Sequence, residues 1–115
     1  RIAERYIRAF KQTSKIKFLV PENNVKSSWH LFVIKIKNRT QLMQRLNAAG
    51  IGSSMHFIPV HNHPYYKEHY QFDPKNFPVA NKVYEESISL PIFPDLSMEK
   101  VDRIITAVLQ HIENV

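Results

Sequence analysis

The stretch SSWHLFVIKIKNRTQLMQRLNAAG, residues 27–50, decides the fold because it joins a strand pattern directly to a helix pattern. Side chains from Trp29 to Lys37 alternate between two faces, which predicts a β-strand. One face carries His30, Phe32, Ile34 and Ile36, and the other carries Trp29, Leu31 and Val33 before it ends in Lys35 and Lys37. A half-buried strand is normally polar along its second face. The first half of this strand therefore needs cover on both faces, either from a local loop or from another domain.

The second half of the stretch predicts a short helix. Asn38 or Thr40 suits its N-cap, and Gly50 suits the left-handed residue that ends it. The residues that face inward are Leu42, Met43 and Leu46. A second strand is expected over Ile51–Phe57, which gives a strand–helix–strand unit.

Helices are also predicted at both ends of the chain. RIAERYIRAF, residues 1–10, places its apolar side chains on one helical face but starts without a capping residue. SMEKVDRIITAVLQHI, residues 97–112, begins with a capping Ser97 and has Glu99 in its first turn. Its apolar positions recur at helical spacing: Val101, Ile104, Ile105, Val108, Leu109 and Ile112. The uncapped first helix favours a chain cut from something longer.

Three shorter elements are expected between these helices. They are a turn or helix over Tyr65–Tyr70, a helix from Pro78 that carries Val79, Val83 and Tyr84, and a third strand in SISLP at residues 87–91. We therefore expect an α/β fold, an α+β sandwich whose small sheet of about three strands has helices mostly on one face. The length fits a single domain over 1–115, with a lead-in helix at 1–14 and a small α/β domain at 28–115.

Composition narrows the class of protein. The chain has 115 residues, no cysteine and a net charge of +6. The lack of cysteine excludes disulfides and permits the cytoplasmic location that we expect. No apolar run approaches the roughly 20 residues of a membrane span, so no membrane partner is expected. The positive charge suits an anionic partner, but it is spread along the chain and also fits an ordinary solvated surface.

A histidine-rich stretch follows the predicted helix, GIGSSMHFIPVHNHPYY. His56, His61 and His63 are residue types that bind zinc, and catalytic zinc sites often use three protein ligands. Pro59 and Pro64 exclude a helix here, and with it the helical spacing of a ligand pair. No cysteine and no nearby carboxylate supports a metal either. We therefore predict no metal site.

A catalytic centre is not indicated in this stretch. It contains no recognisable set of nucleophile, base and orienting residue. The whole chain has two glycines, too few for a phosphate-cradling loop. Two interpretations remain: a proline-stiffened loop that presents His56, His61 and the tyrosines to a ligand, or a surface loop whose aromatic side chains cover the core. The residues alone leave both open.

Four segments together resemble a known family. SSWHLFVIKI, the helix ending in AAGIG, MHFIPVHNHPYY and SISLPIFPDLSMEKVDRII resemble, in that order, the C-terminal part of the DegT/DnrJ/EryC1/StrS aminotransferases. The opening RIAERY resembles the helix that leads into that small domain, so the likeness covers essentially the whole chain. The resemblance implies the small C-terminal domain of a fold-type-I pyridoxal-phosphate enzyme. It also implies that the chain is the C-terminal fragment of a longer aminotransferase.

The resemblance carries expectations about function. The parent enzyme would transfer an amino group, from glutamate, to a nucleotide-diphosphate keto-sugar in polysaccharide, lipopolysaccharide or glycan synthesis. Aminotransferases of UDP-linked 4-keto-sugars are the nearest likeness. A missing N-terminal large domain would hold pyridoxal phosphate, and the whole enzyme would be a homodimer. No catalytic residue is expected in this chain, whose lysines match no cofactor-binding segment. The resemblance assigns substrate binding to His56, Phe57, Pro59 and His61.

Other classes of protein are alternatives. A basic α/β domain of this size also suits a free-standing module that binds nucleic acid or another protein. Against nucleic acid, the chain lacks the glycine- and aromatic-rich strand of an RNA-recognition motif. A regulatory domain that kept the fold without the chemistry is a further alternative. Coding sequence upstream in the family pattern would separate a fragment from these free-standing domains.

Overall fold

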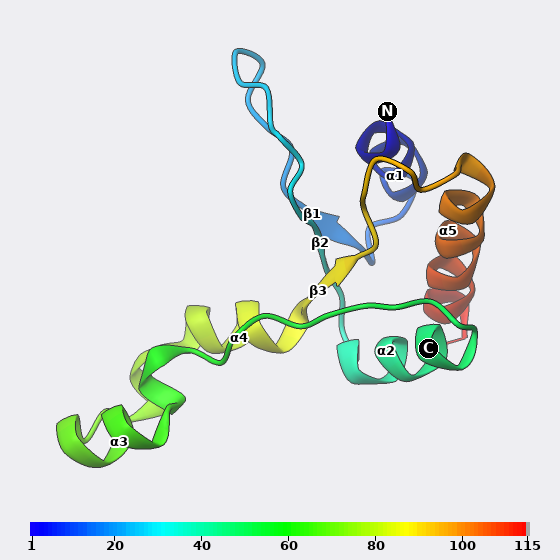
Figure 1. Cartoon of the computed structure of the whole chain (residues 1–115). Helices are drawn as coiled ribbons and strands as arrows, with labels where there is room; N and C mark the ends of the chain where they lie inside the picture. Colours follow the sequence, from blue (N-terminus) through cyan, green and yellow to red (C-terminus); the bar gives the residue numbers. More distant parts are fainter. Residues whose placement is uncertain (115) are drawn as a thin grey trace.

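The computed structural model describes residues 1–114 and has a three-stranded sheet at its centre (Figure 1). In chain order the elements are α1 (Ile2–Phe10), β1 (Lys17–Phe18), β2 (Phe32–Lys35), α2 (Arg39–Ala48), a 3₁₀ turn (Val60–Asn62), α3 (Pro64–Tyr70), a second 3₁₀ turn (Pro74–Asn76), α4 (Pro78–Glu86), β3 (Ser87–Leu90) and α5 (Met98–Glu113). Helices α1, α2 and α5 gather on one side of the sheet, whereas α3 and α4 extend away from it (Figure 1). The predicted fold class, a small sheet with helices mostly on one face, is confirmed.

The sheet has the order β1–β2–β3, and both strand pairs are antiparallel. Ile34 lies at its centre, opposite Phe18 on one side and Ile88 on the other. The strand is shorter than the predicted Trp29–Lys37. Trp29 has a left-handed φ of 49°, which interrupts the extended chain before β2 begins. The Trp29 ring instead packs on Phe32, with the ring centroids 5.5 Å apart. The prediction that these two side chains lie on opposite faces of one strand was therefore wrong.

The predicted strand over Ile51–Phe57 is wrong. Only Ser54 pairs, in one isolated antiparallel bridge with Ser89, after which the chain leaves the sheet. The remaining strand of the sheet is instead β1, which has two residues and was not predicted from the sequence. The sheet is therefore an antiparallel arrangement and not a strand–helix–strand unit.

The core lies between the sheet and the helices on its covered side. From α1 it takes Ala3, Tyr6, Ala9 and Phe10, and from α5 it takes Val101, Ile104, Ile105, Val108 and Ile112. Both helices bury the face that their spacing predicted, and each large apolar side chain contributes about 1.5–3 kcal/mol on burial. The Ser97 hydroxyl accepts a hydrogen bond from the Lys100 backbone N–H at 3.3 Å, as expected of the N-cap of α5.

Helix α2 also follows its predicted pattern. Leu42 and Leu46 are fully buried, and Gly50 ends the helix with a φ of 75°, in the left-handed region that glycine favours. Asn38 occupies the N-cap position, but its side chain makes no capping hydrogen bond. Its φ of 59° is left-handed, a conformation that asparagine adopts more readily than most residues, and it forms the turn between β2 and α2.

Residues 55–86, here called the arm, carry α3 and α4 away from the core (Figure 1). Among the described residues, neither helix buries a side chain. The helix expected from Pro78 forms, but its Val79 is 76% exposed and Val83 is also exposed. The arm therefore presents apolar side chains that this chain by itself leaves uncovered.

Candidate functional site

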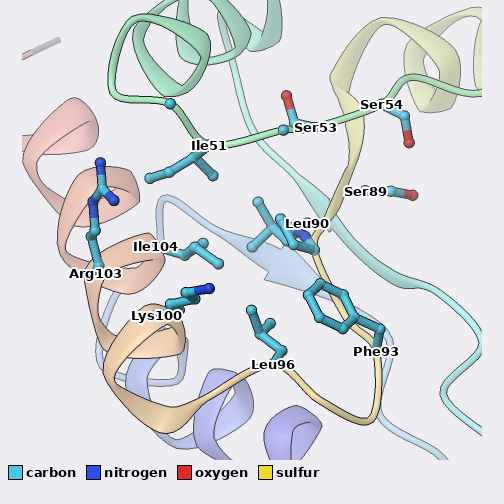
Figure 2. Close-up of a pocket in the computed structure, with 13 residues that line it drawn as sticks. Ile51, Ser53, Ser54, Ser89, Leu90, Phe93, Leu96, Lys100, Arg103 and Ile104 are labelled. Atoms are coloured by element: carbon cyan, nitrogen blue, oxygen red, sulfur yellow. The ribbon is translucent and has the colours of Figure 1, made fainter.

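An open groove of about 630 Å³ lies where the first half of the histidine-rich stretch passes β3 and α5. Figure 2 shows its side chains: Ile51, Ser53 and Ser54 along one edge, Leu90, Phe93 and Leu96 across from them, and Lys100, Arg103 and Ile104 on α5. Lys100 points into the groove, and Arg103 lies beside the turn that ends α2 (Figure 2). Apolar surface with a few polar groups at its edge is typical of a small-molecule site.

Two contacts hold the edge formed by residues 50–54. The Arg103 guanidinium donates a hydrogen bond to the backbone carbonyl of Ala49, at the C-terminus of α2. Ser54 exchanges backbone hydrogen bonds with Ser89, at 3.3 Å and 2.8 Å between nitrogen and oxygen. The chain between these anchors is therefore fixed against β3 and α5, although it forms no strand.

A buried tyrosine positions the opposite edge. The Tyr6 hydroxyl donates a hydrogen bond of 2.7 Å to the backbone carbonyl of Pro91, which lines the groove. Burial raises the pKa of the Tyr6 hydroxyl well above its usual range. Helix α1 thus connects to the groove through one hydrogen bond made by a side chain that stays protonated.

The groove has a positive charge balance. Lys100 and Arg103 lie three residues apart on α5, so both side chains lie on the same side of the helix. None of the residues that line the groove is acidic. Arg103 uses one N–H group on Ala49, and its guanidinium has five donors in all, so it can still bind an anion. The arrangement suits a ligand with an apolar part and a negatively charged part.

His56 contacts strand β3 beside this groove but is not one of the residues that line it. Its Nε2 lies 3.0 Å from the hydroxyl oxygen of Ser89, which lines the groove. Phe57 follows it with 95% of its side chain exposed, and Pro59 is half-buried. None of the predicted site residues lines the groove itself, and their role in binding substrate stays a prediction.

His61 has a different setting, inside the arm. It is 6% exposed, and its ring stacks on Phe77 with a centroid distance of 4.5 Å. Its Nε2 lies 2.6 Å from the Oδ1 of Asn81, an atom that only accepts, so Nε2 carries the proton. The amide nitrogen of Asn81 in turn donates to the carbonyl of Pro74 at 2.8 Å. The structure thus joins His61 to α4 and does not bring it next to His56.

Neither a metal cluster nor a membrane span is found in the described chain. Over residues 1–114, no three His, Cys, Asp or Glu side chains come together in a group that could hold a metal ion. Across the same residues, every helix is too short or too polar to cross a bilayer.

Sequence reasoning missed the polar residues of the groove that lie far along the chain from the histidines. Ser89 was treated only as part of a strand, and no role was assigned to Lys100 or Arg103. The spacing of the two cations was visible in the sequence. Their meeting with the turn at Gly50 depends on the packing of α2 against α5, which no local pattern reports.

Comparisons with known proteins give a consistent result. Residues 1–109 match the DegT/DnrJ/EryC1/StrS aminotransferase family. The spore coat polysaccharide biosynthesis protein SpsC of Bacillus subtilis is 35% identical over 114 residues, which cover 93% of this chain and 29% of SpsC. Two solved structures are also similar. DesV of S. venezuelae, in complex with a ketimine intermediate, has a TM-score of 0.89 and 30% identity over 99% of this chain and 31% of its own. The PMP form of the putative sugar aminotransferase Spr1654 of Streptococcus pneumoniae has a TM-score of 0.87 and 34% identity over 98% of this chain and 29% of its own.

The groove residues do not make a complete pyridoxal-phosphate site. That cofactor needs a lysine for its covalent link, a partner for its pyridine nitrogen and donors for its phosphate. Lys100 and Arg103 offer cationic donors, but none of the lining residues supplies a carboxylate for the ring nitrogen.

Proposed function

The chain belongs to the DegT/DnrJ/EryC1/StrS aminotransferase family and corresponds to its C-terminal portion, and we propose that it forms the substrate-binding small domain of a sugar-nucleotide aminotransferase. The whole protein transfers an amino group from glutamate to a nucleotide-linked keto-sugar. A UDP-linked 4-keto-sugar is the substrate that we expect. The product enters polysaccharide, lipopolysaccharide or glycan synthesis.

One observation carries this proposal: the groove combines a cationic wall with an apolar floor, and its residue Ser89 is hydrogen-bonded to His56. A sugar nucleotide has the matching parts. Its diphosphate suits Lys100 and Arg103, because charge-assisted hydrogen bonds to phosphate are strong. The sugar hydroxyl groups suit the pair of His56 and Ser89, which offers both donors and acceptors. Phe93 and Leu90 provide apolar surface for the sugar ring or the base.

The remaining parts of the enzyme lie outside this chain. The chain spans 29% of the length of two curated relatives that it matches, so more than two thirds of such a protein lies outside it. We expect an N-terminal large domain to hold pyridoxal phosphate and two copies of the whole protein to form a homodimer in the cytoplasm. The uncovered apolar side chains of the arm, including Phe57 and Val79, support a partner surface of this kind.

Alanine substitutions in the whole protein test the proposal. Replacing His56 removes the hydrogen-bonding group beside Ser89, so we expect H56A to raise the KM for the sugar nucleotide more than it lowers kcat. Losing one hydrogen bond to a neutral sugar hydroxyl costs about 0.5–1.5 kcal/mol, or roughly two- to tenfold in kcat/KM. His69, exposed on α3 and bonded only to its own helix, is the matched control. Equal KM values for H56A and H69A would contradict a binding role for His56.

His61 needs a further variant because it also holds the arm together. H61A removes the imidazole, whereas H61Q keeps a side-chain N–H group that can donate to Asn81. If His61 binds substrate, both variants raise KM. If only H61A does, the effect comes from loss of the arm contact, and His61 is not part of the substrate site.

A further inference from the structure

A second groove, lined by five lysines, lies between the sheet and the C-terminal end of α5, and we propose that it binds a compact small molecule carrying several phosphate groups. The groove has a volume of about 450 Å³ and shares no lining residue with the groove described above. Its lysines are Lys15, Lys17, Lys35, Lys37 and Lys82. They come from the loop after α1, from β1, from β2 and the residues after it, and from α4. We call this feature the lysine groove.

The charges of the lysine groove are not balanced within the chain. Glu86 is the only acidic residue among those that line it. Over residues 1–114, the ion pairs found are Arg1 with Glu4 and Arg5 with Asp102, so none of the five lysines pairs with a carboxylate there. A concave surface of one charge concentrates ions of the opposite charge more strongly than a flat one.

The strand register adds to this imbalance. Lys17 of β1 lies directly opposite Lys35 of β2, and like charges in that position destabilise a strand pair. Lys37 follows two residues after Lys35, in the spacing that returns to the same face of an extended chain. The Lys15 ammonium donates to the carbonyl of Ile112 at 2.8 Å, which fixes it at the end of α5. A bound anion would relieve the repulsion between the two paired lysines.

A buried histidine supplies an independent observation. His111 lines the lysine groove, is 1% exposed, and neither of its ring nitrogens has a hydrogen-bond partner among the described residues. Burial lowers the pKa of His111, and the positive charge of Arg45 lowers it further. The ring is therefore neutral near pH 7 and carries one N–H donor. An unpaired buried polar group is costly. Both ring nitrogens are covered, so a phosphate oxygen could accept from that N–H group only if the groove wall shifts on binding.

The shape of the lysine groove favours a small molecule over nucleic acid. Its volume lies within the range of about 300–1,000 Å³ that is typical of small-molecule sites. A nucleic-acid site instead follows the phosphate backbone along an extended positive track. The chemistry expected here is a tri- or diphosphate group, which inorganic tripolyphosphate and a nucleoside triphosphate share.

Calorimetric titration of the whole protein that carries this chain with sodium tripolyphosphate tests the proposal. The variant K17A/K35A removes the facing pair, and K67A/K75A removes two exposed lysines outside the groove as a charge-matched control. We expect K17A/K35A to weaken binding about ten- to a hundredfold and the control to change it no more than about twofold. Equal weakening in both variants, or no saturable binding by the unmodified protein, would overturn the proposal.

Two further titrations distinguish the possible ligands. Binding of UTP tighter than tripolyphosphate would identify a nucleotide, and equal binding would identify the phosphate group alone; both support the proposal. Tighter binding of a 20-nucleotide single strand than of either would overturn it in favour of nucleic acid. The K100A variant, which lacks one cation of the first groove, should bind tripolyphosphate in the lysine groove normally, and K17A/K35A should keep its KM for the sugar nucleotide. Phosphate binding in the lysine groove and KM for the sugar nucleotide therefore test the two proposals independently.

Discussion

Replacing Tyr6 with phenylalanine removes one hydroxyl group that connects α1 to the candidate site. Tyr6 is 0% exposed, and its hydroxyl donates to the carbonyl of Pro91 at 2.7 Å. The Y6F variant keeps the ring, so the packing against Phe10 and Phe32 stays. It loses a net contribution of about 1 kcal/mol from the hydrogen bond and leaves a partly buried carbonyl without its partner. We therefore expect a loss of about 2 kcal/mol in the free energy of unfolding.

Urea unfolding of the chain measures this loss. With a denaturant slope of about 2 kcal/mol per molar, typical for a small domain, the midpoint should fall by about 1 M. Y65F is the control, because Tyr65 is 58% exposed and loses the same atom. A midpoint for Y6F that matches Y65F would refute the reasoning, since the buried hydrogen bond would then contribute nothing.

The pH dependence provides a second test of the same contact. Burial raises the pKa of Tyr6 in the folded chain above its value of about 10 in the unfolded chain. Above pH 10 the unfolded state therefore releases a proton that the folded state keeps, and this residue's contribution to stability falls as the pH rises. The slope is at most about 1.4 kcal/mol per pH unit. Y6F should lose stability less steeply than the unmodified chain between pH 10 and pH 11, and equal slopes would count against a buried, protonated hydroxyl.

Three other substitutions test contacts of the fold. Burial lowers the pKa of His111, so below about pH 6.5 the unfolded chain binds a proton that the folded chain does not, and stability decreases as the pH is lowered. H111L should reduce this loss of stability between pH 7 and pH 5, and an unchanged slope would contradict the reasoning. Arg39 donates through Nη1 to the carbonyls of Tyr84 at 2.9 Å and Ser87 at 3.3 Å, so R39K should lower the free energy of unfolding by about 1–2 kcal/mol. A variant as stable as the parent in urea would show that these two hydrogen bonds do not stabilise the fold. Gly50 has a φ of 75°, and its added Cβ would lie 3.9 Å from Arg103, so G50A should cost about 1 kcal/mol from backbone strain alone; a stabilised variant in the same assay would contradict this.

The long helices could be predicted from the sequence, whereas parts of the sheet could not. Helix α5 has sixteen residues and repeats its apolar positions at the helical period, which leaves no competing pattern. Strand β1 has two residues, too few for any alternation to show. The stretch Ile51–Phe57 mixes apolar and polar residues like a strand, but only Ser54 pairs with its neighbour. Whether a neighbouring strand accepts a segment depends on tertiary packing, which the segment itself does not encode.

Only the part of the candidate site that lies within one continuous stretch of sequence could be predicted. The prolines and histidines of the stretch 50–66 predicted a stiff loop, either beside a ligand or over the core, and the structure places His56 of this loop against Ser89 of β3. The contact of His61 with Asn81 spans twenty residues, and that of Arg103 with Ala49 spans fifty-four. These pairs form because helices pack together, so no pattern within either segment reveals them.

Amino transfer by the whole protein that carries this chain is the most direct test of its proposed role in binding a sugar nucleotide. The measurement is mass spectrometry of the product after the protein, supplied with pyridoxal phosphate and glutamate, is mixed with a UDP-linked 4-keto-hexose. We predict a UDP-amino-sugar, with H56A needing roughly two- to tenfold more substrate for the same rate. The absence of any amino-sugar from UDP- and TDP-linked keto-sugars alike, by a protein that binds the cofactor, would contradict the proposed function.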